Sequence, residues 1–189
     1  MTKDVFELEV GGKMLKIKIT DWATQASGSC LVSYGDTEVI ATATMSNKDV
    51  SAQDFFPLSV DYEEKFYAAG KIYGSRFLKR ESRPTDEAIL TSRMIDRAIR
   101  PLFPKDFKKE IQAIVSCLSW DTENDPDILG MIGASFALAS SHIPWNGPLA
   151  AVRVGRVNGE FILNPSYQQR AGGTMDLTLA ALERDGKIL

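Results

Sequence analysis

Three arginines with helical spacing are the residues of this chain best suited to binding an anion. Arg93, Arg97 and Arg100 stand at positions i, i+4 and i+7, so in a helix they fall within an arc of about 60°. Guanidinium groups donate paired hydrogen bonds to phosphate oxygens, and a row of three therefore suits a phosphodiester or free phosphate. The same spacing also fits a solvated face on which Asp96 pairs with Arg93 and Arg100. Spacing alone leaves both interpretations open.

These arginines belong to a segment that concentrates positive charge. Residues 65–109 hold 12 Lys/Arg and 5 Asp/Glu, a net charge of +7, whereas the remaining residues hold 10 basic and 20 acidic side chains, a net charge of −10. Phe66, Tyr67, Tyr73 and Phe77 lie among these cations. Aromatic rings stack on bases while Lys and Arg follow phosphates, so this mixture favours single-stranded nucleic acid over a small anion. A solvated basic surface is the alternative.

A helix is predicted to present the arginines. Residues 83–87 (RPTDE) are typical of a helix start, with Pro and Thr before the first turn and acids within it. Pro101 is expected to end the helix after Arg100. The face opposite the arginines is expected to be buried; it comprises Leu90, Met94, Ile95, Ala98 and Leu102.

The rest of the chain predicts an α/β (α+β) fold with mixed sheets around a buried central helix. The predicted extended segments are a hairpin over 6–19, strands at 29–34, 38–44 and 56–64, a strand buried on both faces at 111–120, a hairpin over 150–163 and a strand at 176–182. A polar loop is expected at 47–54. An apolar helix rich in small residues is expected after Asp125-Pro126, and Gly130-x-x-Gly133 lies inside it, where a phosphate loop would not. We expect one domain over 1–182, with 183–189 the truncated start of another hairpin or of a linker.

Composition excludes several classes of protein. Apolar residues at 44% and charged residues at 25% are ordinary for a globular domain, and no apolar run reaches the ~18 residues of a membrane span. The N-terminus lacks the form of a signal peptide, so a cytoplasmic protein without a membrane partner is expected. Cys30 and Cys117 are expected to be buried free thiols. With His142 as the single histidine, a His/Cys metal cluster is excluded.

Two acidic groups are the remaining candidates for chemistry. Asp61 and Glu63 would share one face of a strand and could hold Mg²⁺, although a solvent-facing acidic strand end is the favoured alternative. Residues 121–127 (DTENDPD) carry the pattern of a loop followed by a helix cap. Neither group comes with a nucleophile or a base. The sequence therefore predicts no catalytic residue and no metal ligand in this chain.

Long strings of this sequence closely resemble the first core domain of the bacterial polynucleotide phosphorylase family. They are DFFPLSVDYEEKFYAAGKIYGSRFLKRESRPTDEAILTSRMIDRAIRPLFPKDF, NDPDILGMIGASFALASSHIPWNGPLAAVRVG and FILNPS, and the resemblance runs from about residue 6 to residue 182. It implies the RNase PH-like sandwich of β-sheets and helices. It also implies 3′-to-5′ degradation of single-stranded RNA, in which inorganic phosphate as co-substrate releases nucleoside diphosphates reversibly.

The resemblance further implies cofactors and partners that this chain does not hold alone. Family members form homotrimeric rings, meet partners in RNA-degradation complexes and use Mg²⁺ or Mn²⁺. Their catalytic acids and metal ligands lie in a second core with a D-x5-D-x-K pattern. That pattern is absent here, because residues 106–108 (DFK) and 185–187 (DGK) lack the upstream Asp. The resemblance thus makes this chain an N-terminal part of the enzyme, inactive alone.

The resemblance assigns binding roles to seven residues. Phe77-Leu78-Lys79-Arg80 matches a channel loop that grips RNA, although the family has two aromatics and two arginines there. Leu78 cannot stack as an aromatic ring does, and Lys79 lacks the paired donors of Arg. The implied RNA-binding residues are Phe77, Lys79, Arg80, Arg83, Arg93, Arg97 and Arg100, with Arg93 and Arg97 also holding phosphate.

Three functions follow as hypotheses. The first is the N-terminal core of a phosphorolytic exoribonuclease. The second is a non-catalytic RNA-binding or assembly module of an exosome-like ring. The third, an autonomous RNase PH-like enzyme, is disfavoured by the missing acidic pattern.

Overall fold

The computed structural model of the chain describes residues 2–49, 55–72, 74, 77 and 83–189. Within these residues, a six-stranded sheet is built from the first two-thirds of the chain: β1 (Thr2–Val10), β2 (Lys13–Thr20), β3 (Gly28–Tyr34), β4 (Thr37–Asp49), β5 (Leu58–Glu64) and β6 (Lys109–Ser119). The strand order is β1-β2-β3-β4-β6-β5. Neighbouring strands are antiparallel except β5 and β6, which run parallel.

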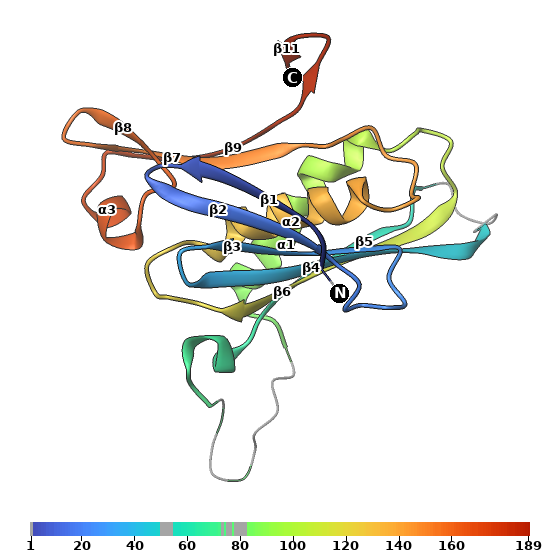
Figure 1. The fold of residues 1–189 in the computed structure, drawn as a ribbon, viewed down its shortest axis with the longest axis horizontal. Helices are drawn as coiled ribbons and strands as arrows, with labels where there is room; N and C mark the ends of the chain where they lie inside the picture. Colours follow the sequence, from blue (N-terminus) through green and yellow to red (C-terminus); the bar gives the residue numbers. More distant parts are fainter. Residues whose placement is uncertain (1, 50–54, 73, 75–76, 78–82) are drawn as a thin grey trace.

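A second, three-stranded sheet in the described part of the chain follows β6 in sequence. It comprises β7 (Ala150–Val157), β8 (Glu160–Leu163) and β9 (Met175–Ala181), in the order β8-β7-β9. Residues Asn158 and Gly159 join β7 to β8 with φ of 51° and 90°, as a tight two-residue hairpin requires. Beyond β9, β10 (Glu183–Arg184) pairs with β11 (Lys187–Ile188), and this hairpin projects from the body (Figure 1).

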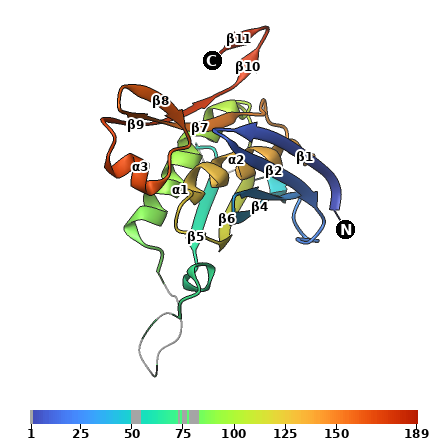
Figure 2. The ribbon, with the colours of Figure 1, turned by 60° about the vertical axis from the view of Figure 1, so that its left-hand side comes forward.

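The helix α2 (Pro126–Ala139) lies between the two sheets (Figures 1 and 2). Its Asp125 cap accepts a hydrogen bond from the Asp127 amide at 3.0 Å, and Pro126 occupies the first turn. Eleven of its residues are buried. At Gly133 an added Cβ would stand 2.9 Å from the Ala41 Cβ, so the helix packs closely on β4 through small residues. The predicted central helix is confirmed, and its glycines serve packing.

The other helices are shorter or lie at the side of the large sheet. They are α1 (Asp86–Ile99), which packs on β5, α3 (Tyr167–Ala171), and the 3₁₀ turns η1 (Phe66–Ala69) and η2 (Arg100–Leu102). Figure 2 shows η1 projecting below the end of β5. Among the described residues, no helix has the length and apolarity needed to cross a bilayer.

Most of the predicted elements are confirmed, with four differences. Strand β4 extends through Asp49, into the segment expected to be a loop. Strand β6 alternates buried residues with partly exposed ones instead of being buried on both faces. Helix α3, capped reciprocally by Ser166 and Gln169, was not predicted. Residues 183–188 form a two-stranded hairpin of their own. The predicted division at residue 182 stays a prediction.

Candidate nucleic-acid interface

Helix α1 begins as the sequence indicates. The Thr85 hydroxyl accepts a hydrogen bond from the Ala88 amide at 3.1 Å, and Asp86 and Glu87 stand in the first turn, where carboxylates interact favourably with the helix dipole. The helix ends at Ile99 and continues as the η2 turn through Pro101.

The buried face of α1 differs from the expected one. It is formed by Ala88, Thr91, Ile95 and Ile99, each almost fully buried. Leu90, expected in the core, is 66% exposed, and the Met94 and Ala98 side chains are only partly buried. These four residues are spaced by 3, 4 and 4 positions, which fits a helical stripe as well as the predicted set does. The observed stripe contains a threonine, whereas the predicted one contained Leu90.

An open groove of about 800 Å³ runs beside this helix. It is lined by α1, η2 and the start of β5, with the following residues: Leu58, Val60, Leu90, Ser92, Arg93, Met94, Asp96, Arg97, Arg100 and Pro101. We call this cavity the arginine groove. Leu90 therefore contributes to its wall, because the helix is turned relative to the prediction.

The three arginines of the groove differ in their contacts. Arg93 and Arg97 are exposed, and neither side chain forms an ion pair or hydrogen bond with any described residue. Arg100 is engaged within the chain: it contacts the Asp96 carboxylate at 2.6 and 3.0 Å and donates to the carbonyls of Phe56 and Leu58 at 3.1 and 3.2 Å. Its guanidinium also lies 5.8 Å from the centre of the Phe56 ring. Two of the three guanidiniums are therefore free of hydrogen bonds and ion pairs with described residues, and the RNA-binding role of Arg100 stays a prediction.

Of the other predicted binding residues, the structure describes Phe77 and Arg83, and neither lines this groove. Phe77 is 89% exposed. Arg83 is exposed and lines a smaller cavity of about 320 Å³ with Asp61 and Glu63. Lys79 and Arg80 fall outside the described residues.

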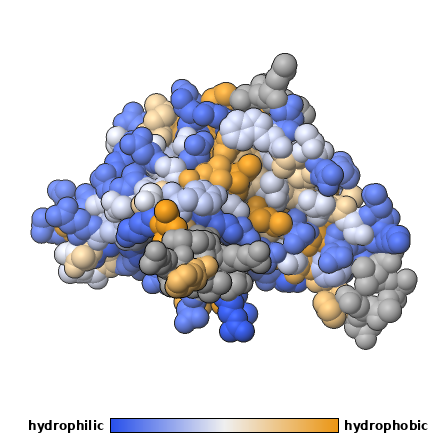
Figure 3. Space-filling model, turned by 90° about the horizontal axis from the view of Figure 1, so that it is seen from below, coloured by the Kyte–Doolittle hydropathy of each residue, from blue (hydrophilic) through white to orange (hydrophobic). Residues whose placement is uncertain are grey.

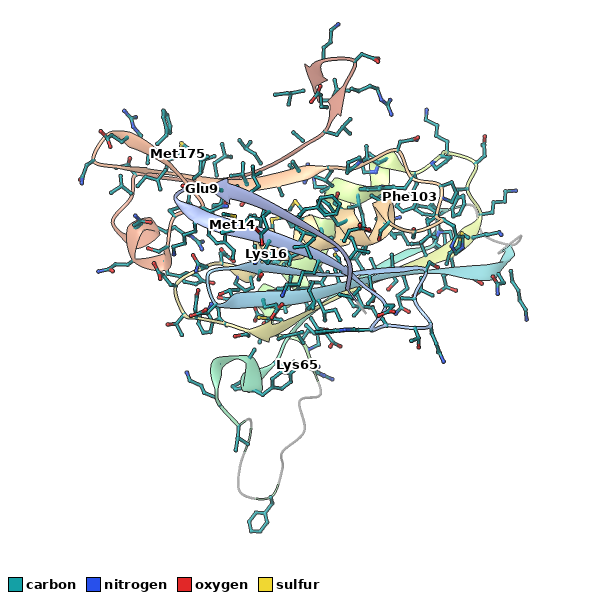
Figure 4. The ribbon with its side chains drawn as sticks, in the orientation of Figure 1. Glu9, Met14, Lys16, Lys65, Phe103 and Met175 are labelled. Atoms are coloured by element: carbon teal, nitrogen blue, oxygen red, sulfur yellow. The ribbon has the colours of Figure 1, made fainter. Side chains whose placement is uncertain are left out.

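Strand β5 carries the acids that could have held a metal. The Gln112 amide donates to the Asp61 carboxylate at 3.3 Å, and the Lys65 ammonium lies 3.0 Å from the Glu63 carboxylate. Lys65 stands where the chain leaves β5 for η1 (Figure 4). Over the described parts of the chain, no group of three His, Cys, Asp or Glu side chains could hold a metal ion. These residues therefore do not fit the Mg²⁺ or Mn²⁺ that the resemblance implies.

A buried cluster of charges was missed by the sequence reasoning. The Asp125 carboxylate contacts Arg153 of β7 at 3.0 Å and Arg170 of α3 at 2.7 Å, and both arginines contact Asp176 of β9. Asp127 lies 3.8 Å from Arg153. Burial and the Asp125 charge raise the pKa of Asp127 to about 7. The cluster's members are spread over residues 125–176, and no local pattern signals it.

Comparison with known proteins places this geometry in a family. Residues 12–144 match the family described as "3' exoribonuclease family, domain 1". Residues 147–189 match the family described as "3' exoribonuclease family, domain 2". The chain belongs to the 3′ exoribonuclease (RNase PH) family.

Named relatives and a solved structure narrow the comparison. The chain is 54% identical over 179 residues to the polyribonucleotide nucleotidyltransferase of Exiguobacterium sibiricum, covering 95% of this chain and 24% of that protein. It is 54% identical to the enzyme of that name from Thermus thermophilus, covering 93% and 24%. The chain thus spans about a quarter of the length of these relatives. Rice Rrp46 has a TM-score of 0.68 at 12% identity, over 95% of this chain and 76% of Rrp46, and shows the shared fold.

Proposed function

We propose that this chain is the N-terminal core of a phosphorolytic 3′-to-5′ exoribonuclease and supplies its RNA- and phosphate-binding arginines. In this reaction an oxygen of inorganic phosphate attacks the phosphorus of the 3′-terminal linkage. The bond from that phosphorus to the 3′ oxygen of the preceding nucleotide breaks, and a nucleoside diphosphate leaves. Cationic groups stabilise the charge on the transferring phosphoryl group, and this is the role we assign to Arg93 and Arg97.

The pair of available guanidiniums on α1 carries this proposal. Arg93 and Arg97 are one helical turn apart, exposed, and free of hydrogen bonds and ion pairs with described residues, whereas Arg100 beside them is bonded to Asp96, Phe56 and Leu58. Arginines retained for the fold alone would be expected to resemble Arg100. Two unpaired guanidiniums over an open groove instead suit successive phosphates of RNA.

Residues upstream of α1 extend the proposed RNA path. Phe77, at 89% exposure, can stack on a base, and we assign Lys79, Arg80 and Arg83 to phosphate contacts along the same strand. We assign Arg100 a positioning role, since four of its five N–H donors are engaged within the chain. The wider proposal includes a homotrimer, Mg²⁺ or Mn²⁺ held by residues outside this chain, partners in RNA degradation and a cytoplasmic location. The names of the relatives support the nucleotidyl-transfer part of the proposal alone.

Charge reversal of the two available arginines tests the proposal. Arg93→Glu with Arg97→Glu is expected to weaken binding of a single-stranded RNA to the purified chain, measured by fluorescence anisotropy at several salt concentrations. Loss of two phosphate contacts is expected to lower the slope of log K against log salt by about 1.4, since each single-strand contact contributes about 0.7. In a protein that also carries the D-x5-D-x-K core, the same change is expected to abolish release of nucleoside diphosphates.

A matched control separates local contacts from net charge. Arg184→Glu with Lys187→Glu makes the same change in net charge on the exposed β10–β11 hairpin, and it is expected to leave the salt slope unchanged. Equal losses in both double variants would contradict a role for the arginine groove. RNA binding by the wild-type chain, with no phosphorolysis in the protein that carries the second core, would favour the non-catalytic RNA-binding module.

A further inference from the structure

A second cavity, of about 540 Å³, opens at the other end of β5 from the arginine groove and shares no residue with it. We call it the η1 cavity. Its walls come from η1, the ends of β5 and β6, the first turns of α1 and α2, and α3. The volume falls within the range of about 300–1,000 Å³ that is typical of sites for small ligands.

Aromatic surface forms one side of the η1 cavity. The Trp120 and Tyr167 rings meet edge to face, with centroids 5.9 Å apart and an interplanar angle of 89°. Tyr167 is 37% exposed and Phe66 is 40% exposed. Seen from the side on which η1 projects, hydrophobic surface lies open in the middle of the molecule with hydrophilic residues around it (Figure 3). Flat rings bordering a cavity offer a stacking surface to a base of any sequence.

Two carboxylates provide the acceptors of the η1 cavity. Glu64 ends β5 and Glu87 lies in the first turn of α1, and both line the cavity. The Thr85 hydroxyl donates to the Glu64 carboxylate at 3.4 Å. Burial and the charge of Glu87 raise the pKa of Glu64, so a hydrogen-bond donor from a ligand would relieve an unfavourable arrangement. Carboxylates accept from exocyclic amino groups, such as those of adenine and cytosine, and are repelled by carbonyl oxygens.

A cation at the rim completes the set of groups. Lys71 is exposed and forms no ion pair with any residue that the structure describes, whereas Lys65 on the same rim lies 3.0 Å from Glu63. Since Lys65 is paired with Glu63, Lys71 is the lining cation available to a phosphate among the residues that the structure describes.

We propose that the η1 cavity binds a nucleobase of single-stranded RNA and prefers bases with an exocyclic amino group over uracil. Tyr167 and Trp120 provide the stacking surface, Glu64 and Glu87 accept hydrogen bonds from the amino group, and Lys71 contacts a phosphate. The inference rests on the proposed function, because it requires RNA to reach this chain. It adds a base-reading site to a groove that contacts phosphates alone.

Two labelled oligonucleotides test the inference on the purified chain. Fluorescence anisotropy with hexaadenylate and hexauridylate is measured for the wild type, Tyr167→Ala, Glu87→Ala and Lys71→Ala. Tyr167→Ala is expected to weaken both ligands about tenfold, as loss of one stacked base does. Glu87→Ala is expected to weaken hexaadenylate several-fold while hexauridylate is unchanged, which removes the base preference. Phe161→Ala, at an exposed ring on β8, is the control and is expected to change neither affinity.

The outcomes distinguish the inference from the proposed function. If the η1-cavity variants bind both ligands as the wild type does while Arg93→Glu with Arg97→Glu loses binding, the cavity is not a base site and the proposed function stands. If the wild type binds neither ligand, both fail. Lys71→Ala tests the site in a variant that is expected to fold, because an exposed lysine can be truncated without disturbing the core. Unchanged affinity for both ligands in this variant also contradicts the inference.

Discussion

Neighbouring arginines on one helix serve different purposes because their surroundings differ. Arg100 stands next to the carbonyls of Phe56 and Leu58 and one turn beyond Asp96, so its donors are satisfied within the chain. Arg93, two turns earlier on α1, faces open solvent. Sequence spacing could place the three residues on one side of a helix. It could not tell them apart, because the two carbonyls that accept from Arg100 belong to residues more than 40 positions away.

Removing the guanidinium of Arg100 is expected to destabilise the fold. Arg100→Gln loses hydrogen bonds to the Phe56 and Leu58 carbonyls and a partly exposed pair with Asp96, and we expect the free energy of unfolding to fall by about 1–2 kcal/mol. Arg93→Gln is the matched control and is expected to stay within about 0.5 kcal/mol of the wild type. Urea unfolding followed by circular dichroism measures both. Equal effects would contradict the different roles of the two residues.

The buried guanidinium of Arg153 is expected to matter more. Its side chain is 9% exposed, as is that of Asp125, and Arg153→Met leaves two carboxylates of α2 without this partner. Breaking a buried pair in this way costs about 3–5 kcal/mol. Arg156→Met, on the same strand but with an exposed side chain, is expected to cost little. Similar midpoints in urea for the two variants would show that the buried cluster does not stabilise the fold.

At the scale of elements, close contact between α2 and β4 limits which residues fit. Gly133→Val is expected to lower the free energy of unfolding by about 1–3 kcal/mol or more, because its Cβ would meet the Ala41 Cβ at 2.9 Å. The double variant Gly133→Ala with Ala41→Gly removes the opposing methyl and is expected to unfold nearer the wild type than Gly133→Ala alone. If Ala41→Gly restores no stability to Gly133→Ala, the contact with the Ala41 methyl is not what excludes larger residues at position 133.

Elements with a regular pattern could be predicted, and those set by tertiary contacts could not. The hairpin of β7 and β8 followed from Asn158-Gly159, and α2 followed from its cap and its apolar run. Five-residue α3 has too few residues for a periodic signal, although Ser166 followed by Gln169 is a capping pattern that could have revealed it. The prediction of which side of α1 faces the core was wrong at Leu90, because several sets of residues on that helix satisfy the same periodicity.

At the scale of the molecule, charged groups join the two sheets through α2. Asp125 and Asp127 at the start of α2 contact Arg153 of the three-stranded sheet, while the rest of α2 packs on the six-stranded sheet.

The concentration of basic residues and the helical spacing of the arginines predicted an anion-binding face on α1 from the sequence alone. The η1 cavity could not be predicted, because its lining residues come from several separate segments of the chain. The buried cluster could not be predicted either, because it joins the start of α2 to α3 and to two strands of the smaller sheet.

The raised pKa of Asp127 makes stability depend on pH near neutrality. In the folded chain Asp127 keeps its proton to about pH 7, whereas an ordinary Asp, with a pKa of 3.8, has lost it. The folded state therefore binds more protons between these values, and stability falls as pH rises through this window, by at most about 1.4 kcal/mol per pH unit for one group. The raised pKa of Glu64 acts in the same direction.

Replacing Asp127 with Asn is expected to flatten this dependence. Unfolding free energies at pH 5, 6 and 7 should decline less steeply in Asp127→Asn than in the wild type. Glu160→Gln, at an exposed position on β8, should keep the wild-type decline. Parallel declines in Asp127→Asn and the wild type would assign the proton to another group.

The contacts of Arg100 also bear on how this chain avoids unwanted association. β5 is the last strand of its sheet, so one of its sides has no neighbouring strand among the described residues. The guanidinium already occupies the carbonyls of Phe56 and Leu58, next to and within that strand. An extended segment from another molecule would have to displace a cation held by Asp96 before it could add to the sheet there. We therefore expect the contacts of Arg100 to disfavour the addition of a further strand at the start of β5.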